Sequence, residues 1–335
     1  PMSIVKKLRY NFMRNLGAPA VIRISELGRR KRPGKPSNHY GPPLKSTRRL
    51  KEIVKKHYFL SRYAAGAKPV AWVTSGAPVE MLRPFDFYTI YPENHGALCG
   101  AQKLGPELCS AAEEKGYHQD LCSYARIDLG HYFSGRTPAG KLPKPDLLFA
   151  SNNICQTVVY WYKALAHYLD VPLVLFDTPY NFEEVTDNDI SYMVRQFEEM
   201  IPVLERVSRR RLNHSKLKEF IRLGKEASFT WGEVLGTMKA RPAPMTIFDA
   251  FAHMVPIVSL RGLPVALDYY RELLGELKNR VEQGVGALQD ERKRLMWDNI
   301  PIWFKMRDHS NLFAQRDMNF VTATYTNAWA ETTPY

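Results

Sequence analysis

The chain has 335 residues, of which 45% are hydrophobic and 24% charged, and its formal net charge at pH 7 is +13. This length is enough for two domains, each with its own core. No run of 18 apolar residues and no apolar signal-peptide core occurs, so we expect neither a membrane span nor a membrane partner. Four cysteines are too few for a disulfide framework, which predicts a reducing, cytoplasmic setting.

The positive charge is concentrated at the N-terminus. Residues 1–57 carry 16 Lys or Arg and two acidic residues, whereas the rest of the chain is nearly neutral. The densest part, Arg29–Lys35, is of a kind that binds nucleic acid or the phosphates of a nucleotide-like ligand. It can equally be a solvated extension that wraps an acidic partner subunit. Because no nucleic-acid-binding motif accompanies it, nucleic acid is not the expected partner.

Residues 1–66 are predicted to form a basic, helical N-terminal arm. One or two short amphipathic helices are expected within residues 1–27, and a helix from about 47 to 65. Between them, residues 28–47 hold four prolines together with Gly34 and Gly41 and are typical of an irregular linker.

Residues 67–186 alternate between strands and helices, which predicts a first Rossmann-like domain with a parallel sheet. The expected strands are 68–74, 85–91, 146–150 and 171–176. The expected helices are 96–103, 106–115, one from Cys122 to about Phe133, and 156–169.

The C-terminal half is predicted to hold a helical region and a second sheet. Residues 187–290 have mostly helical periodicity, interrupted at Arg241–Pro244. Strands at 294–297 and 318–324 then start a second Rossmann-like domain over residues 291–335, which we expect to be unfinished at the last residue. The predicted fold class is therefore α/β, with two doubly wound parallel sheets, a helical insertion and the basic arm.

Several familiar catalytic signatures are absent from the sequence. It has no Gly-x-Gly-x-x-Gly after its first predicted strand, no phosphate-binding loop and no nucleophile elbow. It also has no Cys-x-x-Cys and no His-Glu-x-x-His. Nucleotide hydrolysis, thioredoxin-like redox chemistry and zinc-protease chemistry are therefore not expected.

Cys122 and Cys155 stand in comparable places, each just before a predicted helix. A thiolate at a helix N-terminus faces unpaired backbone N–H groups and the positive end of the helix dipole. This environment lowers a cysteine pKa and favours a bound anion or a metal–sulfur centre. The alternative is a pair of buried structural thiols, since cysteine is a common core residue.

Glu93 and His95 lie where the second predicted strand ends, and both are candidate acid–base groups. The alternative for Glu93, together with Asn94, is to cap the helix that follows. Cys109 is interpreted as a core residue, whereas Cys99 is ambiguous. Asp177, at the end of the fourth strand, suits either a ligand hydroxyl or a turn.

A further set of residues occurs in a fixed order that resembles subunits of the 2-hydroxyacyl-CoA dehydratase and benzoyl-CoA reductase family. The set covers roughly residues 68–335 and leaves the basic arm outside. Its parts are Tyr91–Ala97, Asp120–Arg126, Lys144–Asp146, Asn152–Thr157, Trp161-Tyr162, Asp177–Tyr180, Arg241–Pro244, Arg261-Gly262, Thr322–Tyr325 and Trp329.

The resemblance implies an iron–sulfur enzyme of anaerobic metabolism. Such subunits pair with a homologous second subunit and hold a 4Fe–4S cluster through three cysteines. A separate iron–sulfur ATPase acts as activator and delivers one electron at low potential. The electron converts a CoA-thioester substrate into a radical anion, which either loses water, a lyase reaction, or undergoes ring reduction, an oxidoreductase reaction.

On the matching motifs, the resemblance implies Cys122 and Cys155 as cluster ligands. The third family ligand belongs to the second α/β domain, and Cys99 is the substitute that this sequence offers. Three other functions stay open: a cluster-poor, non-catalytic partner subunit, a reductase of small molecules with a larger iron–sulfur centre, and a nucleic-acid binder that uses the basic arm.

Overall fold

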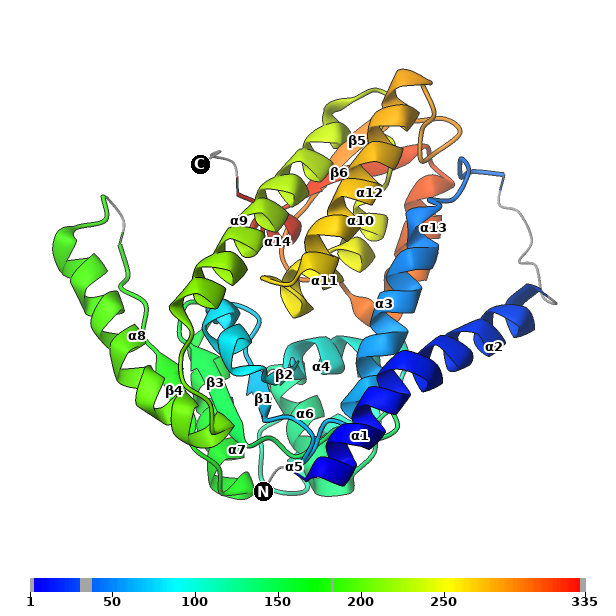
Figure 1. The fold of residues 1–335 in the computed structure, drawn as a ribbon. Helices are drawn as coiled ribbons and strands as arrows, with labels where there is room; N and C mark the ends of the chain where they lie inside the picture. The colour runs from blue at the N-terminus through cyan, green and yellow to red at the C-terminus, as the bar shows by residue number, and fades with distance from the viewer. Residues whose placement is uncertain (1–2, 31–37, 182–183, 332–335) are drawn as a thin grey trace. The chain divides into compact units, whose positions relative to one another are not determined.

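The computed structural model describes residues 3–30, 38–181 and 184–331 (Figure 1). They form two compact units. The first combines residues 1–17 with 58–218, and the second combines residues 18–57 with 219–335. The predicted basic arm is therefore shared between the units. Part of its dense run Arg29–Lys35 lies outside the described residues.

The first unit contains a four-stranded sheet in which every neighbouring pair is parallel. Its strands are β1 (Val70–Val73), β2 (Tyr88–Ile90), β3 (Leu147–Ser151) and β4 (Leu173–Phe176), in the order β2-β1-β3-β4. Every residue of β1 and β3 is buried. Such continuous apolar runs are typical of central parallel strands, because both faces are covered. The predicted parallel α/β arrangement is confirmed for this unit.

Helices connect these strands and contribute further buried apolar side chains to the core. The connecting elements are η2 (Val79–Phe85), α4 (Pro92–Ala101), α5 (Gly105–Glu113), α6 (Ser123–Ser134) and α7 (Gln156–Leu169). Outside the sheet lie α1 (Ile4–Phe12), the π-helical turn η1 (Met13–Gly17) and α8 (Asp187–Ser208). Cys99, Leu108 and Ile127, one each from α4, α5 and α6, share one apolar cluster.

Two boundaries differ from the sequence prediction. The second strand begins at Tyr88 rather than at Phe85, because Phe85 ends a 3-10 helix and Asp86 follows in a left-handed conformation with φ 60°. The next helix begins at Pro92, four residues earlier than expected. Proline suits the first turn of a helix, since its missing N–H would have no helical partner there.

The second unit is mainly helical and contains a two-stranded parallel sheet. Its helices are α2 (Ala18–Arg30), α3 (Ser46–Ser61), α9 (His214–Gly236), η3 (Thr237–Lys239), α10 (Ile247–His253), α11 (Val255–Ser259), α12 (Pro264–Glu282), η4 (Trp303–Lys305), α13 (Met306–Ala314) and α14 (Thr324–Asn327). The strands β5 (Lys293–Trp297) and β6 (Met318–Ala323) pair in parallel. Trp231 and Tyr270 lie in its core.

The molecule is thus a mixed α/β protein with parallel sheets and many helices. The expected second strand pair is present, but within the described residues it has two strands and does not make a complete Rossmann-like sheet. None of the helices in the described segments has the length and hydropathy that crossing a bilayer requires.

Candidate functional site

The winding of the first sheet changes direction between β1 and β3, because β2 lies beyond β1 and β4 beyond β3. In parallel α/β sheets, ligands bind outside the carboxyl ends of the strands at such a point. Here the loop after β1 contacts the loop after β3. The Asn153 side-chain amide donates a hydrogen bond to the Gly76 carbonyl at 3.2 Å. A Cβ on Gly76 would lie 2.6 Å from the Asn153 side-chain oxygen, so a larger residue there would displace the Asn153 side chain.

The Glu93 carboxylate is anchored to the end of β1. Its Oε2 accepts hydrogen bonds from the Ser75 backbone N–H at 2.7 Å and from the Ser75 hydroxyl at 2.9 Å. The cap residue of α4 is Tyr91, which makes no side-chain capping bond. Glu93 therefore bonds to the loop after β1 instead of capping its own helix.

The pKa of Glu93 is raised to about 7. Burial of the carboxyl is the main cause, the hydrogen bonds from Ser75 oppose it, and the negative charge of Asp128 raises the pKa further. A carboxyl that titrates near neutral pH suits general acid–base chemistry. Ser75 was missing from the predicted site, although its position directly after the first strand was the available signal.

His95 is fully buried. Its Nε2 lies 2.7 Å from the Thr137 hydroxyl and 3.4 Å from the Cys99 sulfur. Its Nδ1 lies 3.8 Å from an Asp128 oxygen. His95 therefore joins α4, α6 and the loop that follows α6.

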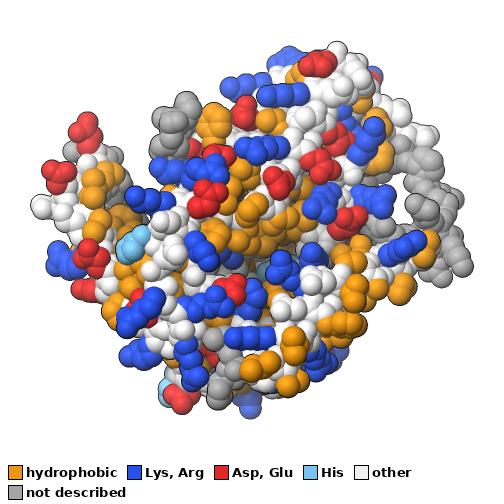
Figure 2. Space-filling model, in the orientation of Figure 1, with side chains coloured by type: hydrophobic (Ala, Val, Ile, Leu, Met, Phe, Trp, Pro, Cys, Tyr) orange, Lys and Arg blue, Asp and Glu red, His pale blue; other side chains and the backbone are white. Residues whose placement is uncertain are grey.

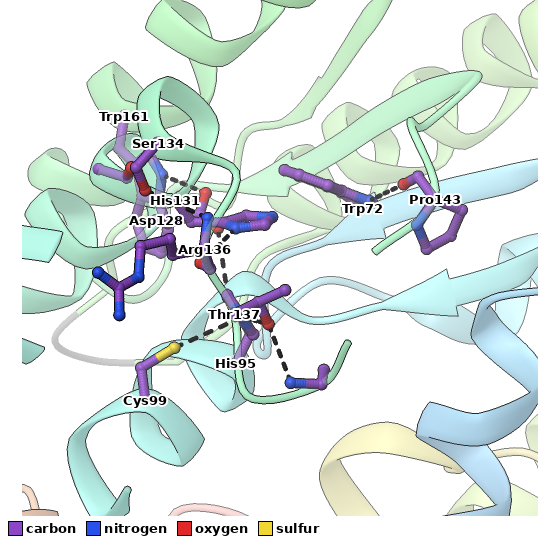
Figure 3. Close-up of polar contacts among 12 residues, drawn as sticks. Trp72, His95, Cys99, Asp128, His131, Ser134, Arg136, Thr137, Pro143 and Trp161 are labelled. Atoms are coloured by element: carbon purple, nitrogen blue, oxygen red, sulfur yellow. Dashed lines mark hydrogen bonds and ion pairs between the residues drawn. The ribbon is translucent and has the colours of Figure 1, made fainter. Parts of the chain in front are cut away.

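Asp128 extends this buried network into α7. Its Oδ2 accepts a hydrogen bond of 3.0 Å from the Trp161 indole N–H, and its Oδ1 has no hydrogen-bond partner among the described residues (Figure 3). The His131 ring packs edge-on against the His95 ring. Burial, and then the neighbouring His95, lower the pKa of His131. Trp161 and Tyr162 are buried.

Cys122 and Cys155 are both exposed, and each is the N-cap residue of a helix, α6 and α7 respectively. The predicted placement before helices is confirmed, and the alternative of two buried structural thiols is wrong. Neither helix has a side-chain capping bond at this end. The first N–H groups of each helix are therefore not capped by the side chain of the N-cap cysteine.

The two remaining cysteines lie in a different environment. Cys99 is fully buried in the apolar cluster with Leu108 and Ile127, and Cys109 packs against the same cluster. Burial raises the pKa of Cys99 to about 12 and also raises the pKa of Cys109. Both thiols are therefore protonated at neutral pH, and the core interpretation of Cys109 is confirmed.

Cys122 and Cys155 are the exposed thiols available to the 4Fe–4S cluster that the resemblance implies. Exposed thiols at two helix N-termini fit the chemistry of a thiolate-held, negatively charged cluster. Within the described residues, however, no three His, Cys, Asp or Glu side chains are grouped closely enough to hold a metal. The described chain therefore offers two suitable thiols and not a complete set of three.

Asp177 is occupied by protein contacts at the end of β4. Its carboxylate accepts hydrogen bonds from the Asn152 amide and, at 2.6 Å, from the Tyr192 hydroxyl. Its backbone N–H donates to the Gln196 side chain at 2.7 Å. Asp177 therefore fastens α8 to the loop that leads to Cys155.

Fold and site together define a parallel α/β protein with a protonatable carboxyl at the sheet's switch point and thiols at two helix N-termini. The family described as 2-hydroxyglutaryl-CoA dehydratase, D-component, matches residues 74–334. The chain belongs to this family, as its sequence motifs predicted.

Named relatives are subunits of related enzymes. The (R)-2-hydroxyisocaproyl-CoA dehydratase alpha subunit of Clostridioides difficile is 36% identical over 266 residues, covering 78% of this chain and 65% of the relative. The (R)-phenyllactyl-CoA dehydratase alpha subunit of Clostridium sporogenes is 32% identical, covering 78% and 64%. A benzoyl-CoA reductase subunit of Thauera aromatica is 30% identical, covering 78% and 63%. The chain thus spans somewhat less than two thirds of the length of these three relatives.

Proposed function

We propose that this chain is the iron–sulfur subunit of an ATP-driven acyl-CoA enzyme, of the 2-hydroxyacyl-CoA dehydratase or benzoyl-CoA reductase type. The observation that carries the proposal is the pair of exposed thiols, Cys122 and Cys155, each capping the N-terminus of a helix. Exposed thiols at such positions are accessible and electrostatically suited to bind a negatively charged cluster. The names of the relatives supply the substrate class, a CoA thioester.

Cys122 and Cys155 are the proposed ligands of a 4Fe–4S cluster. When bound, this group supplies one electron at low potential to the CoA thioester. The N–H groups at the starts of α6 and α7 stabilise its negative charge. Cys99, the predicted substitute for a third ligand, is left out of the proposal, because burial keeps its thiol protonated.

Glu93 is the proposed acid–base group. With a pKa of about 7, its carboxyl can either donate or accept a proton at neutral pH. The two hydrogen bonds from Ser75 hold the charged form in one orientation. His95, predicted as a second acid–base group, is too deeply buried to meet a substrate directly. It is instead proposed to position the loop after α6 through Thr137.

The proposed partners are a homologous second subunit, which would form a heterodimer with this chain, and an iron–sulfur ATPase activator as electron donor. The subunit designations of the relatives support a multi-subunit enzyme. A second Rossmann-like domain is also proposed, since β5, α13 and β6 form one parallel strand–helix–strand unit. Location in the cytoplasm stays a prediction.

The test is the iron and acid-labile sulfide content of the chain, purified without oxygen. About four of each per chain are expected for one 4Fe–4S cluster. Cys122→Ser and Cys155→Ser should each lose them, whereas Cys109→Ser, a change at a partly buried thiol, should retain them. Absence of iron from the wild-type chain would overturn the proposal and favour a non-catalytic partner subunit.

A further inference from the structure

The outward face of α1 and η1 is a continuous stripe of exposed apolar side chains. Its members are 57–76% exposed: Ile4, Val5, Leu8, Phe12 and Leu16. Ile4, Leu8, Phe12 and Leu16 recur at a spacing of four residues, which places them along one side of a helical segment. Figure 2 shows hydrophobic side chains gathered over this helix among Lys and Arg. Exposed apolar patches of this kind mark interaction sites.

The opposite side of α1 is attached to the first unit. Tyr10 is buried and meets the Tyr88 ring edge-on, with the ring centroids 6.2 Å apart. The Ser3 N–H donates to the Gly66 carbonyl at 2.9 Å, and the Arg9 guanidinium lies 5.1 Å from the centre of the Tyr63 ring. The helix is therefore held in place while its apolar stripe points away from the unit.

The charged residues within α1 and η1 are all basic. Residues 3–25 include Lys6, Lys7, Arg9, Arg14 and Arg23 and contain no Asp or Glu. All five basic side chains are exposed. A partner that covers the stripe must therefore be apolar where it meets the stripe and negatively charged around it.

In the second unit, α2 also has exposed apolar residues, although its sequence includes the acidic Glu26. Val21, Ile24 and Leu27 are 44–69% exposed and recur at a spacing of three residues, with Arg23 beside them. Both helices precede residue 74, where the family match begins. The pattern therefore lies outside the residues that the family match covers.

We propose that α1 and η1 bind the surface of an anionic lipid bilayer. Helices that lie in a membrane interface combine aliphatic and Phe side chains on one face with Lys and Arg around it. Anionic headgroups attract such cations over about a Debye length. Protein interfaces, in contrast, are depleted of Lys, and Lys6 and Lys7 lie within α1 itself.

Surface binding requires no helix that crosses the membrane. The sequence-based expectation of no membrane partner rested on the lack of a long apolar run, which is a criterion for spans only. The proposal also does not depend on an iron–sulfur cluster or on catalysis. It concerns where the enzyme acts, and its test is independent of the proposed function.

The test is co-sedimentation of the full chain with vesicles. Vesicles of phosphatidylcholine with about 30% phosphatidylglycerol should bind at least about tenfold more protein than pure phosphatidylcholine vesicles, because several Lys and Arg lie beside the surface. Binding should fall strongly between 50 and about 500 mM salt as the Debye length shortens. The double variant Leu8→Ser/Phe12→Ser should lose about tenfold or more in binding.

The matched control is Ile190→Ser/Val194→Ser on α8, an exposed apolar pair with the same four-residue spacing on a helix that begins with acidic residues. It should bind like the wild type. The proposal would be overturned by no vesicle binding or by equal binding to neutral and anionic vesicles. Equal losses of binding in both double variants would also overturn it. So would a change in the oligomeric state of Leu8→Ser/Phe12→Ser with unchanged vesicle binding. The last result would identify the stripe as a protein interface.

Discussion

The four cysteines of this chain lie in two contrasting regions of the same unit. Cys122 and Cys155 are exposed at the starts of α6 and α7, whereas Cys99 and Cys109 pack between α4, α5 and α6. The side chain is the same in all four cases. Position relative to a helix terminus and to the apolar core decides whether the thiol is available for chemistry or acts as a small core residue.

The region around Cys99 and Cys109 should lose more stability when a substitution adds volume than the region around Cys122 and Cys155. In α6, a Cβ on Gly130 would lie 1.8 Å from the backbone oxygen of Leu108 in α5, and backbone cannot move aside cheaply. Gly130→Ala should therefore lower the free energy of unfolding by about 3 kcal/mol or more. Urea denaturation of the full chain measures this change.

Gly275→Ala is the control for that prediction. Gly275 lies within α12 and a Cβ there would meet no atom within 4 Å. Alanine should leave stability unchanged or raise it by up to about 1 kcal/mol, because it favours a helix. If the two variants were equally stable, the close crossing of α5 and α6 would be wrong.

The ionisation of Glu93 should make the free energy of unfolding depend on pH. The folded-state pKa of about 7 lies above the ordinary value of 4.5. Between these two values the unfolded chain releases the proton while the folded chain keeps it, so the wild type loses stability as pH rises. Relative to Glu93→Gln, the loss from pH 5 to pH 8 should be about 2–3 kcal/mol.

Urea denaturation at pH 5, 6.5 and 8 measures this difference. All other titrating groups are common to both proteins, so their contributions cancel to first order. A difference between wild type and Glu93→Gln that does not change with pH would contradict the raised pKa of Glu93 and its proposed acid–base role.

Two buried tryptophans donate an indole hydrogen bond to different kinds of acceptor. The Trp161 N–H donates to a buried carboxylate at 3.0 Å, whereas the Trp72 N–H donates to the neutral Pro143 carbonyl at 3.1 Å. Both tryptophans are 4% exposed. Trp161→Phe should cost about 1–2 kcal/mol more than Trp72→Phe, because a charged acceptor loses its partner. Equal losses of unfolding free energy in the two variants, measured by thermal or urea unfolding, would contradict a contribution from the charge of Asp128.

The smallest effects concern the thiols themselves. Cys99→Ser places a hydroxyl in an apolar cluster and should cost about 1 kcal/mol or more. Cys122→Ser at an exposed helix cap should stay within about 0.5 kcal/mol of the wild type, measured without bound iron. Similar losses of stability in both variants would contradict the proposed difference between the buried and the exposed cysteines.

Much of the first unit could be predicted from the sequence because its elements have strong local signals. The helix expected at 156–169 has the same bounds in the structure, since an N-cap, apolar periodicity and a following turn all agree. The strand expected from Phe85 was placed too early. Alternating apolar residues continue through a 3-10 helix, which periodicity does not separate from a strand.

The site was predicted in part. Helix starts can be found from sequence, so the positions of Cys122 and Cys155 were found correctly. The contact between Ser75 and Glu93 joins two different loops and has no local signal. The burial of His95 depends on packing among α4, α6 and the Thr137 loop, which no single segment encodes.

The most direct test of the contrast between the two regions is the alkylation rate of each cysteine in the native chain, measured by mass spectrometry. Cys122 and Cys155 should react at least about 100-fold faster than Cys99, because alkylation requires an accessible thiolate. Anaerobic loading with iron and sulfide should protect Cys122 and Cys155 together and leave Cys109 unchanged. If Cys99 reacted as fast as Cys155, or if loading protected neither exposed thiol, the account of two distinct cysteine environments around a cluster site would be contradicted.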